Sequence, residues 1–434
     1  MRKLFFLLIL TFLYGCREEA PDSYFTVEKA TQYFNSIEEV CNIDNGNLWG
    51  ENLYGPIMFI DRITRRITAN FPDSEGLLKG KDGIYTGYYP KEMVIYTAPV
   101  NYGGTNFAMV PLPNEENEIR TKSRTIHVLY HCLQKRNGIE PILFNQTNMD
   151  DKEARLYLKL EWKALKKAIS AEGNERLVAI RDALVFRGAG RELYQKYTTE
   201  GNHFETYEGL ATFTELKLYF NTADQFKTKI LEYLDYFYSM PSYTRSYGSM
   251  EGALYATLLC DSGYKIAGLK TDTIDLARLV REAYKIELPV ICRDVAGSLA
   301  FSYDLDVISK EEEERLDAIK GRLHQLTSIF TEKAVVYIEL ESPYFAFEPE
   351  DIHPVDTLGT LYNAMRVSDS WGKLTVDKGG CLVSNNYRYL RITAKGFKAD
   401  KNRISGEGWN IILNEGWELV EVKQNYFLRR SMPL

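Results

Sequence analysis

The chain has 434 residues, of which 45% are hydrophobic and 26% charged, and this ordinary globular composition excludes collagen-like, disordered and coiled-coil proteins. The length allows two or three domains. Lys and Arg number 53 against 60 Asp and Glu, giving a net charge of −7. Because no basic block is present either, we expect no nucleic-acid partner.

Residues 1–15 have the pattern of a signal peptide, in which Arg2 and Lys3 precede an almost entirely apolar run over 4–13. About ten apolar residues are too few to cross a bilayer, which takes about twenty. The segment ends in Tyr14-Gly15-Cys16, which resembles a bacterial lipoprotein processing box. We therefore expect a lipid-anchored protein of the bacterial cell envelope, attached to the membrane through an acylated Cys16. A plain secretory signal that ends near a cysteine is the alternative.

The region 16–115 is predicted to contain one helix followed by strands. Residues 26–41 have helical character, and short runs rich in Ile, Val, Tyr and Phe then follow, such as 57–60 and 92–96. Gly and Pro separate these runs, as expected for turns between strands. The pattern favours an N-terminal helix with a β-meander.

The region 116–333 has helical periodicity throughout. We expect helices over 154–169, 174–197, 204–220, 223–238, 248–259, 273–284 and 310–330. Strand-like composition returns in the region 334–434, at 335–340 and 417–422, and predicts an antiparallel β-sandwich or a small barrel. The fold class expected from these three regions is α+β.

Two of the five histidines, His127 and His131, lie four residues apart in a segment with helical spacing of apolar residues. On a helix, side chains at i and i+4 are neighbours on one face, so two imidazoles can share one metal ion. Zinc peptidases carry this pair as His-Glu-x-x-His, in which the Glu is the general base. Here the second position is Val128, which cannot transfer a proton.

The downstream segment Tyr207-Glu208-Gly209-Leu210-Ala211 resembles the glutamate-ligand helix of the gluzincin metallopeptidases, with Tyr207 in place of the usual Asn. The resemblance extends along the chain to a family of bacterial gluzincin-like lipoproteins. Further shared segments are Leu48-Trp49-Gly50, Leu53-Tyr54-Gly55-Pro56, Pro111-Leu112-Pro113, Leu160-Glu161-Trp162-Lys163-Ala164-Leu165, Asp182-Ala183-Leu184-Val185-Phe186-Arg187 and Trp371-Gly372-Lys373-Leu374. The resemblance implies a peptidase-like scaffold with zinc held by His127, His131 and Glu208.

Other polar side chains are weaker site candidates. Glu161 lies on the apolar stripe of its helix and needs a partner there. As a functional residue it is a hydrogen-bond acceptor for a ligand histidine or a displaced general base. The structural alternative is an ion pair with a buried arginine such as Arg187 or Arg191. Glu205 is a second such carboxylate, and Tyr247 is either an oxyanion donor or a residue of ordinary packing. We expect His203 to lie at the surface.

Three functions follow from these features. The favoured one is a zinc-binding, catalytically impaired peptidase homologue that binds peptides or proteins, since loss of a general base typically costs 10²–10⁴-fold in rate. The second is an active hydrolase in which Glu161, Glu205 or another carboxylate replaces the base. The third is a metal-free lipoprotein whose β domains bind glycans or proteins.

Overall fold

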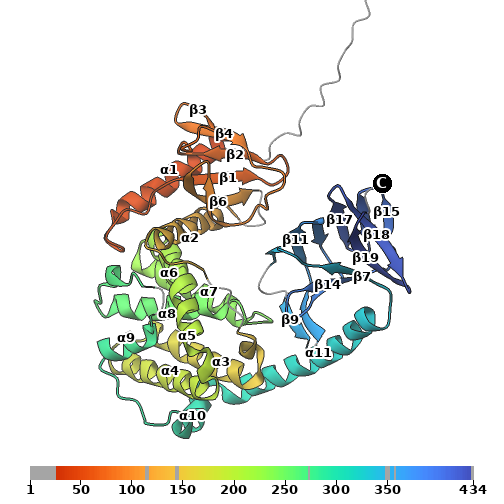
Figure 1. The fold of residues 1–434 in the computed structure, drawn as a ribbon. Coiled ribbons are helices and arrows are strands. Elements are labelled where there is room, and N and C mark those ends of the chain that lie inside the picture. Colours follow the sequence, from red (N-terminus) through yellow and green to blue (C-terminus); the bar gives the residue numbers. More distant parts are fainter. Residues whose placement is uncertain are drawn as a thin grey trace, which may run out of the picture.

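The computed structural model describes residues 26–112, 117–141, 146–271, 274–347, 352–355 and 358–431. The expected signal segment and Cys16 lie outside these residues. A β-rich N-terminal region, a helical centre and a C-terminal region of strands follow one another along the chain, so the predicted α+β class is confirmed (Figure 1). In the described residues no helix combines the length and apolar character needed to cross a membrane.

The N-terminal region consists of α1 (Val27–Asp44) and a six-stranded sheet. The strands are β1 (Ile57–Asp61), β2 (Arg66–Ala69), β3 (Lys79–Lys81), β4 (Ile84–Tyr88), β5 (Ala98–Tyr102) and β6 (Thr105–Leu112). Their order is β3-β4-β2-β1-β6-β5, and β1 and β6 run parallel. Successive side chains of a strand point to opposite faces. Ile57 and Phe59 accordingly join the core shared with the helices, while Met58 and Ile60 pack in a separate cluster.

The strand predicted at 92–96 is wrong, because this segment is irregular. The Arg65 guanidinium donates hydrogen bonds to the carbonyl oxygens of Tyr89, Pro90 and Met93, with distances of 3.1 Å to Tyr89 and 2.6 Å to Met93. Carbonyl groups that a side chain satisfies in this way need no strand partner. Composition alone does not distinguish this loop from a strand, since Ile95 and Tyr96 still pack against the sheet.

The helical centre confirms most of the expected helices and adds short ones that the periodicity did not predict. Its α-helices are α2 (Glu118–Arg136), α3 (Lys152–Ser170), α4 (Gly173–Leu193), α5 (Thr198–Phe204), α6 (Leu210–Tyr219), α7 (Ala223–Tyr238), α8 (Tyr247–Asp261), α9 (Leu276–Ala283), α10 (Arg293–Ala300) and α11 (Leu305–Thr331). A π-helical segment, η3 (Glu205–Gly209), joins α5 to α6. One continuous hydrophobic core extends from α1 and one face of the sheet through α2 to the later helices.

The C-terminal region contains two sheets with a hydrophobic core of their own. The strands are β7 (Val335–Glu339), β8 (Tyr344–Ala346), β9 (Ile352–Val355), β10 (Gly359–Tyr362), β11 (Met365–Asp369), β12 (Gly372–Val376), β13 (Cys381–Val383), β14 (Tyr389–Thr393), β15 (Lys398–Asp400), β16 (Arg403–Gly406), β17 (Trp409–Leu413), β18 (Trp417–Val422) and β19 (Asn425–Arg430). Their orders are β18-β19-β7-β14-β13-β10-β9 and β15-β16-β17-β12-β11-β8. Val336 and Ile338 of the first sheet share a core with Leu374 and Ile411 of the second, as in a sandwich.

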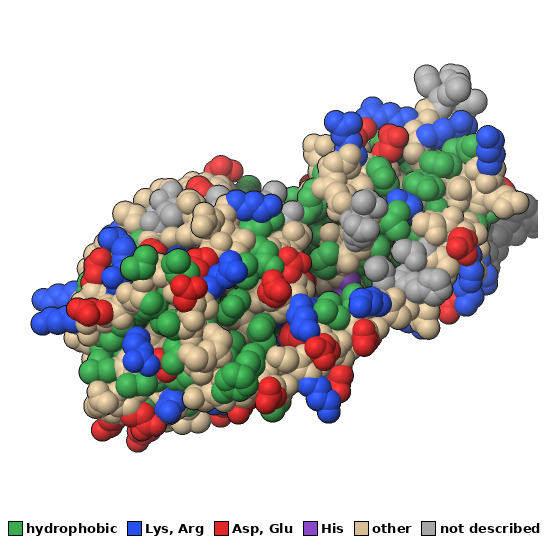
Figure 2. All heavy atoms as spheres, turned by 90° about the horizontal axis from the view of Figure 1, so that it is seen from below, with side chains coloured by type: hydrophobic (Ala, Val, Ile, Leu, Met, Phe, Trp, Pro, Cys, Tyr) green, Lys and Arg blue, Asp and Glu red, His purple; other side chains and the backbone are tan. Residues whose placement is uncertain are grey.

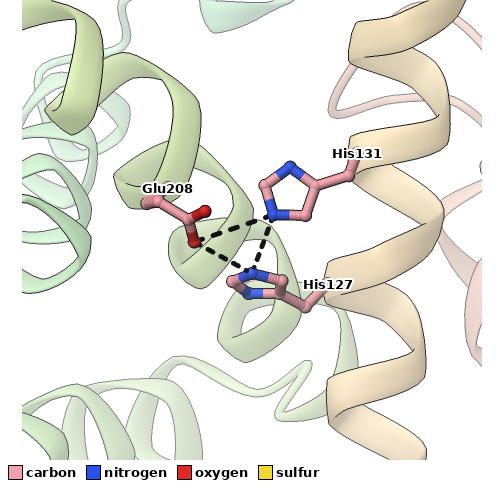
Figure 3. A group of neighbouring side chains, drawn as sticks. All are labelled: His127, His131 and Glu208. Atoms are coloured by element: carbon pink, nitrogen blue, oxygen red, sulfur yellow. Dashed lines mark hydrogen bonds and ion pairs between the residues drawn. The ribbon is translucent and has the colours of Figure 1, made fainter. Parts of the chain in front are cut away.

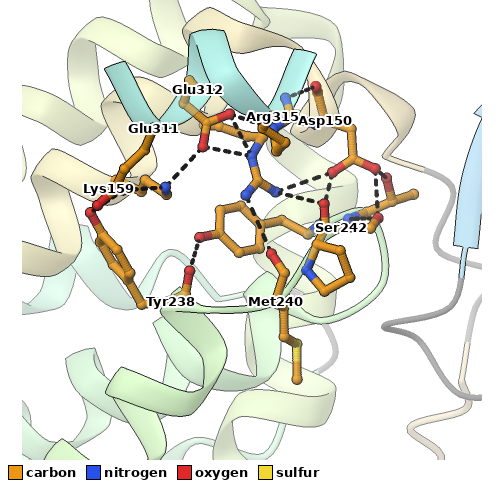
Figure 4. A network of polar contacts seen from close by, with 12 residues as sticks. Asp150, Lys159, Tyr238, Met240, Ser242, Glu311, Glu312 and Arg315 are labelled. Atoms are coloured by element: carbon orange, nitrogen blue, oxygen red, sulfur yellow. Dashed lines mark hydrogen bonds and ion pairs between the residues drawn. The ribbon is translucent and has the colours of Figure 1, made fainter. Parts of the chain in front are cut away.

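The long helix α11 leads from the helical centre to the C-terminal strands (Figure 1). A buried polar network fastens its first half to α3 (Figure 4). Arg155 and Lys159 of α3 lie 2.9 Å from the Glu312 carboxylate, whose side chain is fully buried. Arg155 also lies 3.4 Å from Asp150. Such a network fixes the position of α11 only while its charges remain balanced.

The surface carries mixed charge. Figure 2 shows Asp and Glu side chains interspersed with Lys and Arg over one face of the molecule, together with scattered apolar groups. In this view the molecule has two lobes with a recess between them.

Candidate metal centre

His127 and His131 lie one turn apart on α2, as the spacing predicts. The helix begins after Asn117, whose side chain accepts a hydrogen bond from the backbone N–H of Arg120 at 2.9 Å. Such an N-cap stabilises the first turn. The two histidines are only 7% and 6% exposed. Both rings therefore lie in the interior, where each polar nitrogen needs a partner.

Glu208 comes from η3, which packs against α8. A β-carbon on Gly209 would lie 2.5 Å from the Cα of Gly252, and one on Gly252 would lie 2.2 Å from the carbonyl oxygen of Glu205. Glycine at both positions thus allows the two backbones to touch. The wider π turn is frequent at functional sites in other proteins, and here it carries the carboxylate that faces α2.

The three side chains converge (Figure 3). Glu208 Oε2 lies 3.4 Å from His127 Nε2 and 3.7 Å from His131 Nε2, and the two Nε2 atoms are 3.0 Å apart. One donor atom from each residue lies within 4.8 Å of the other two. This cluster is compatible with a bound metal ion. The Glu208 side chain is 29% exposed, so the cluster is open on its side.

The outer nitrogen of each ring has its own acceptor. Gln134 Oε1 lies 2.6 Å from His131 Nδ1, while Gln134 Nε2 donates to the carbonyl oxygen of Tyr207 at 3.0 Å. Glu215 Oε2 lies 3.2 Å from His127 Nδ1, a close charge contact whose angle falls short of a hydrogen bond. Gln134 assigns the proton of His131 to Nδ1, so the lone pair of its Nε2 faces Glu208 and His127. This is the tautomer that metal-binding histidines adopt.

The charges reinforce one another. Burial by itself would raise the pKa of Glu208, but its contacts with His131 and His127 hold that pKa well below the usual range. Burial opposes a charge on His127, yet the contacts with Glu208 and Glu215 raise its pKa above the ordinary value. Glu215 is also buried, and His127, Arg124 and Arg120 lower its pKa to about 2. The site therefore presents two carboxylates that favour a cation between them.

Sequence reasoning missed Gln134 and Glu215. Glu215 is held by Ser123 Oγ and Tyr233 OH, which donate to its Oε1 at 2.9 and 3.0 Å. A signal was present for Gln134, which lies three residues after His131 on the same helix, a spacing that makes two side chains neighbours. No such signal links Glu215 to His127, because the two residues lie on different helices.

The second residue of the histidine motif, Val128, is 1% exposed and belongs to the hydrophobic core. No titratable side chain is therefore available at this position. Tyr207, the residue before Glu208, stacks on the His131 ring with centroids 4.5 Å apart and an angle of 22° between the planes. The stacked ring holds the imidazole in its orientation.

The other candidates lie elsewhere. Glu161 lies 3.5 Å from Arg187, so the structural ion pair is the alternative that the structure contains. Glu161 also accepts a hydrogen bond from Tyr255 at 2.5 Å. Glu205 lies 2.5 Å from Arg187. Among the described contacts, neither carboxylate touches the ring of His127 or His131, whereas Glu215 contacts His127. A core position does not determine which buried partner a carboxylate finds.

The expectation for His203 is wrong, whereas the oxyanion role of Tyr247 stays a prediction. The Tyr247 hydroxyl donates to Gln146 Oε1 at 2.6 Å within the helical centre, as the packing alternative expects. His203 is 7% exposed rather than at the surface, and its Nε2 lies 3.3 Å from the carbonyl oxygen of Glu140. The short helix α5, which the periodicity did not predict, carries this ring inward.

Comparisons with protein-family models, with curated proteins and with solved structures each find no match for this chain. The class of protein that the fold and the site define is an α+β protein with a His-His-Glu cluster at metal-binding distance.

Proposed function

We propose that this chain is a zinc-binding, gluzincin-like protein of the bacterial cell envelope that has lost the general base and acts as a peptide- or protein-binding module. One observation carries the proposal, namely the convergence of His127, His131 and Glu208 beside Val128. The donor set supports a metal site, and the valine argues against hydrolysis.

Zinc suits these donors better than a hard cation does. Two imidazole nitrogens and one carboxylate are the protein ligands of many catalytic zinc sites, which keep a fourth position open. Magnesium and calcium prefer oxygen ligands alone. The Nδ1 partners Gln134 and Glu215 match the outer partners that orient such ligands.

Zinc at this position would polarise the carbonyl group of a bound peptide. Turnover also requires a base that takes a proton from the attacking water. Glu161 and Glu205 are poor replacements, because both are engaged with Arg187. The chain's own residues therefore support binding and orientation of a carbonyl compound rather than its cleavage.

Elemental analysis of the purified protein tests the metal. We expect one zinc ion per chain, retained in His353→Ala and lost in His127→Ala. His353 is the matched control, since it lies on β9 and contacts Asn363. A protein without stoichiometric zinc would contradict the proposal and favour the metal-free lipoprotein.

The envelope location is tested through Cys16. We expect the full chain to fractionate with membranes in a bacterial host and Cys16→Ser to leave them. Mass spectrometry of the N-terminal peptide should show an acylated cysteine. A soluble wild-type protein would contradict the anchor while leaving the metal site untouched.

A further inference from the structure

Glu205, three residues before Glu208, belongs to a second buried cluster. Its Oε2 lies 2.5 Å from Arg187 Nη2, while Arg187 Nη1 lies 2.7 Å from Glu251 and 3.5 Å from Glu161. All four side chains are at most 6% exposed. Helices α3, α4 and α8 and the segment η3 each contribute one of them.

This cluster has more negative than positive groups. Three carboxyl groups surround one fully buried guanidinium, and Arg191, which is partly exposed, adds a weaker contact of 3.5 Å with Glu205. Burial raises the pKa of Glu205 to about 7, with Arg187 opposing, and burial together with Glu161 raises that of Glu251 well above its ordinary value. A further cation would therefore find carboxyl groups that gain by ionising beside it.

A cavity of about 70 Å³ opens onto these groups. That volume holds roughly five water molecules, so it admits a ligand of similar size. Glu161, Arg187, Glu205 and Glu251 line its buried part, and tyrosines that include Tyr157 and Tyr194 line it where side chains are half-buried. Aromatic rings beside carboxylates are a favourable surrounding for an organic cation.

Two buried polar atoms of the lining have no partner. Asn148 Oδ1, in a side chain that is 6% exposed, receives no hydrogen bond, and Arg187 Nε donates none. Buried polar groups normally find partners, so each such atom asks for an explanation. Both residues line the cavity, so an oxygen without a donor and an N–H without an acceptor beside it favour a ligand that carries both functions.

We propose that this cavity binds a small ammonium compound that carries an acceptor oxygen. In this arrangement the ammonium group faces Glu205, Glu251 and Asn148 Oδ1, and the oxygen of the ligand accepts from Arg187 Nε. A metal ion fits less well. In the described part of the chain, the cluster of ligand atoms within 4.8 Å of one another is His127, His131 and Glu208, not these glutamates.

Isothermal titration calorimetry of the full zinc-loaded protein tests this. The probes are ethanolamine and glycine, which carry an ammonium group and an oxygen, and ethylene glycol, which has the size and the oxygen but no charge. We expect at least one ammonium probe to bind at least tenfold more tightly than ethylene glycol. Preference for ethanolamine or for glycine then shows whether the acceptor oxygen is neutral or charged.

Variants locate the binding. Glu205→Gln and Asn148→Leu should each weaken the better ammonium probe about tenfold or more, while Glu232→Gln, on the exposed face of α7, leaves it unchanged. Thermal melting and zinc content, measured on every variant, identify any that fail to fold. Equal binding of charged and uncharged probes, or full binding by folded Glu205→Gln, would overturn the proposal. Neither result bears on zinc at His127.

Discussion

The rings of His127 and His131 meet edge to face, with an interplanar angle of 75° and their Nε2 atoms 3.0 Å apart. Gln134 holds the proton of His131 on Nδ1, so the lone pair of its Nε2 faces the ring of His127. A neutral His127 with its proton directed at Glu215 presents a second lone pair there, and two lone pairs at this distance repel unless a proton or a metal ion lies between them. A cation at this point therefore stabilises the pair of rings.

Removing the metal should lower stability. A ligand that binds only the native state at 100 times its Kd stabilises it by about 2.7 kcal/mol. We expect a chelator to lower the Tm of the wild type and zinc to restore it, as measured by calorimetry. His127→Ala should respond to neither. A wild-type Tm that ignores both chelator and zinc would contradict the metal centre.

Glu215→Gln should lower the affinity for zinc, although Glu215 is not one of the proposed ligands. The substitution keeps the size of the side chain but removes the charge beside His127 Nδ1. Loss of such an outer partner typically costs 10–100-fold in metal affinity, which competition with a chromogenic chelator measures. The control is Glu232→Gln, an exposed acid of α7, which should bind zinc as the wild type does. Unchanged affinity in Glu215→Gln would mean that its carboxylate does not orient the ring.

Val128→Glu should create or raise peptidase activity. The substitution restores a proton acceptor at the second position of the histidine motif, and such a base contributes about 10²–10⁴-fold. Val128→Gln is the control. Like Glu, Gln places a larger polar side chain at a core position that is 1% exposed, but its amide cannot act as a base. Cleavage of a fluorogenic peptide library measures the gain. Equal activity of the two folded variants would indicate that the site lacks more than its base.

Two adjacent acids of α11 should behave differently. Glu312→Gln leaves Arg155 and Lys159 of the buried network without their shared counter-charge, and breaking a buried pair costs about 3 kcal/mol or more. Glu313 pairs with Lys152 at the surface, where ion pairs contribute little, so Glu313→Gln should leave the unfolding midpoint unchanged. Urea unfolding measures both. Similar midpoints would show that α11 is held by apolar packing alone.

The stability of the helical centre should depend on pH through Glu205. Burial raises its folded pKa to about 7, above the ordinary value of 4.5. The folded state thus binds more protons than the unfolded state between these values, and the contribution of this group to stability falls as the pH rises from 4.5 through 7. Glu205→Gln should lose this part of the slope, an effect of at most about 3 kcal/mol. Parallel pH profiles of the two proteins would contradict it.

The sequence by itself determined the α+β class, most helices and the three side chains of the His-His-Glu cluster. Helical spacing places His127 and His131 on one face because the period of a helix is a local property. The distinction between a helix and a strand likewise depends on the spacing of apolar residues within a short segment. The loop at 92–96 is an exception, and the carbonyl oxygen of Met93 accepts its hydrogen bond from Arg65, 28 residues away.

Only the tertiary structure decided which carboxylate serves which partner. Glu161, Glu205 and Glu215 are all buried acids on helices, and nothing local to each separates them. Packing brings Glu215 to His127 and the other two to Arg187. The physical reason is that a buried charge must be compensated by groups far away in the chain, and the approach of η3 to α8, through Gly209 and Gly252, settles which groups those are.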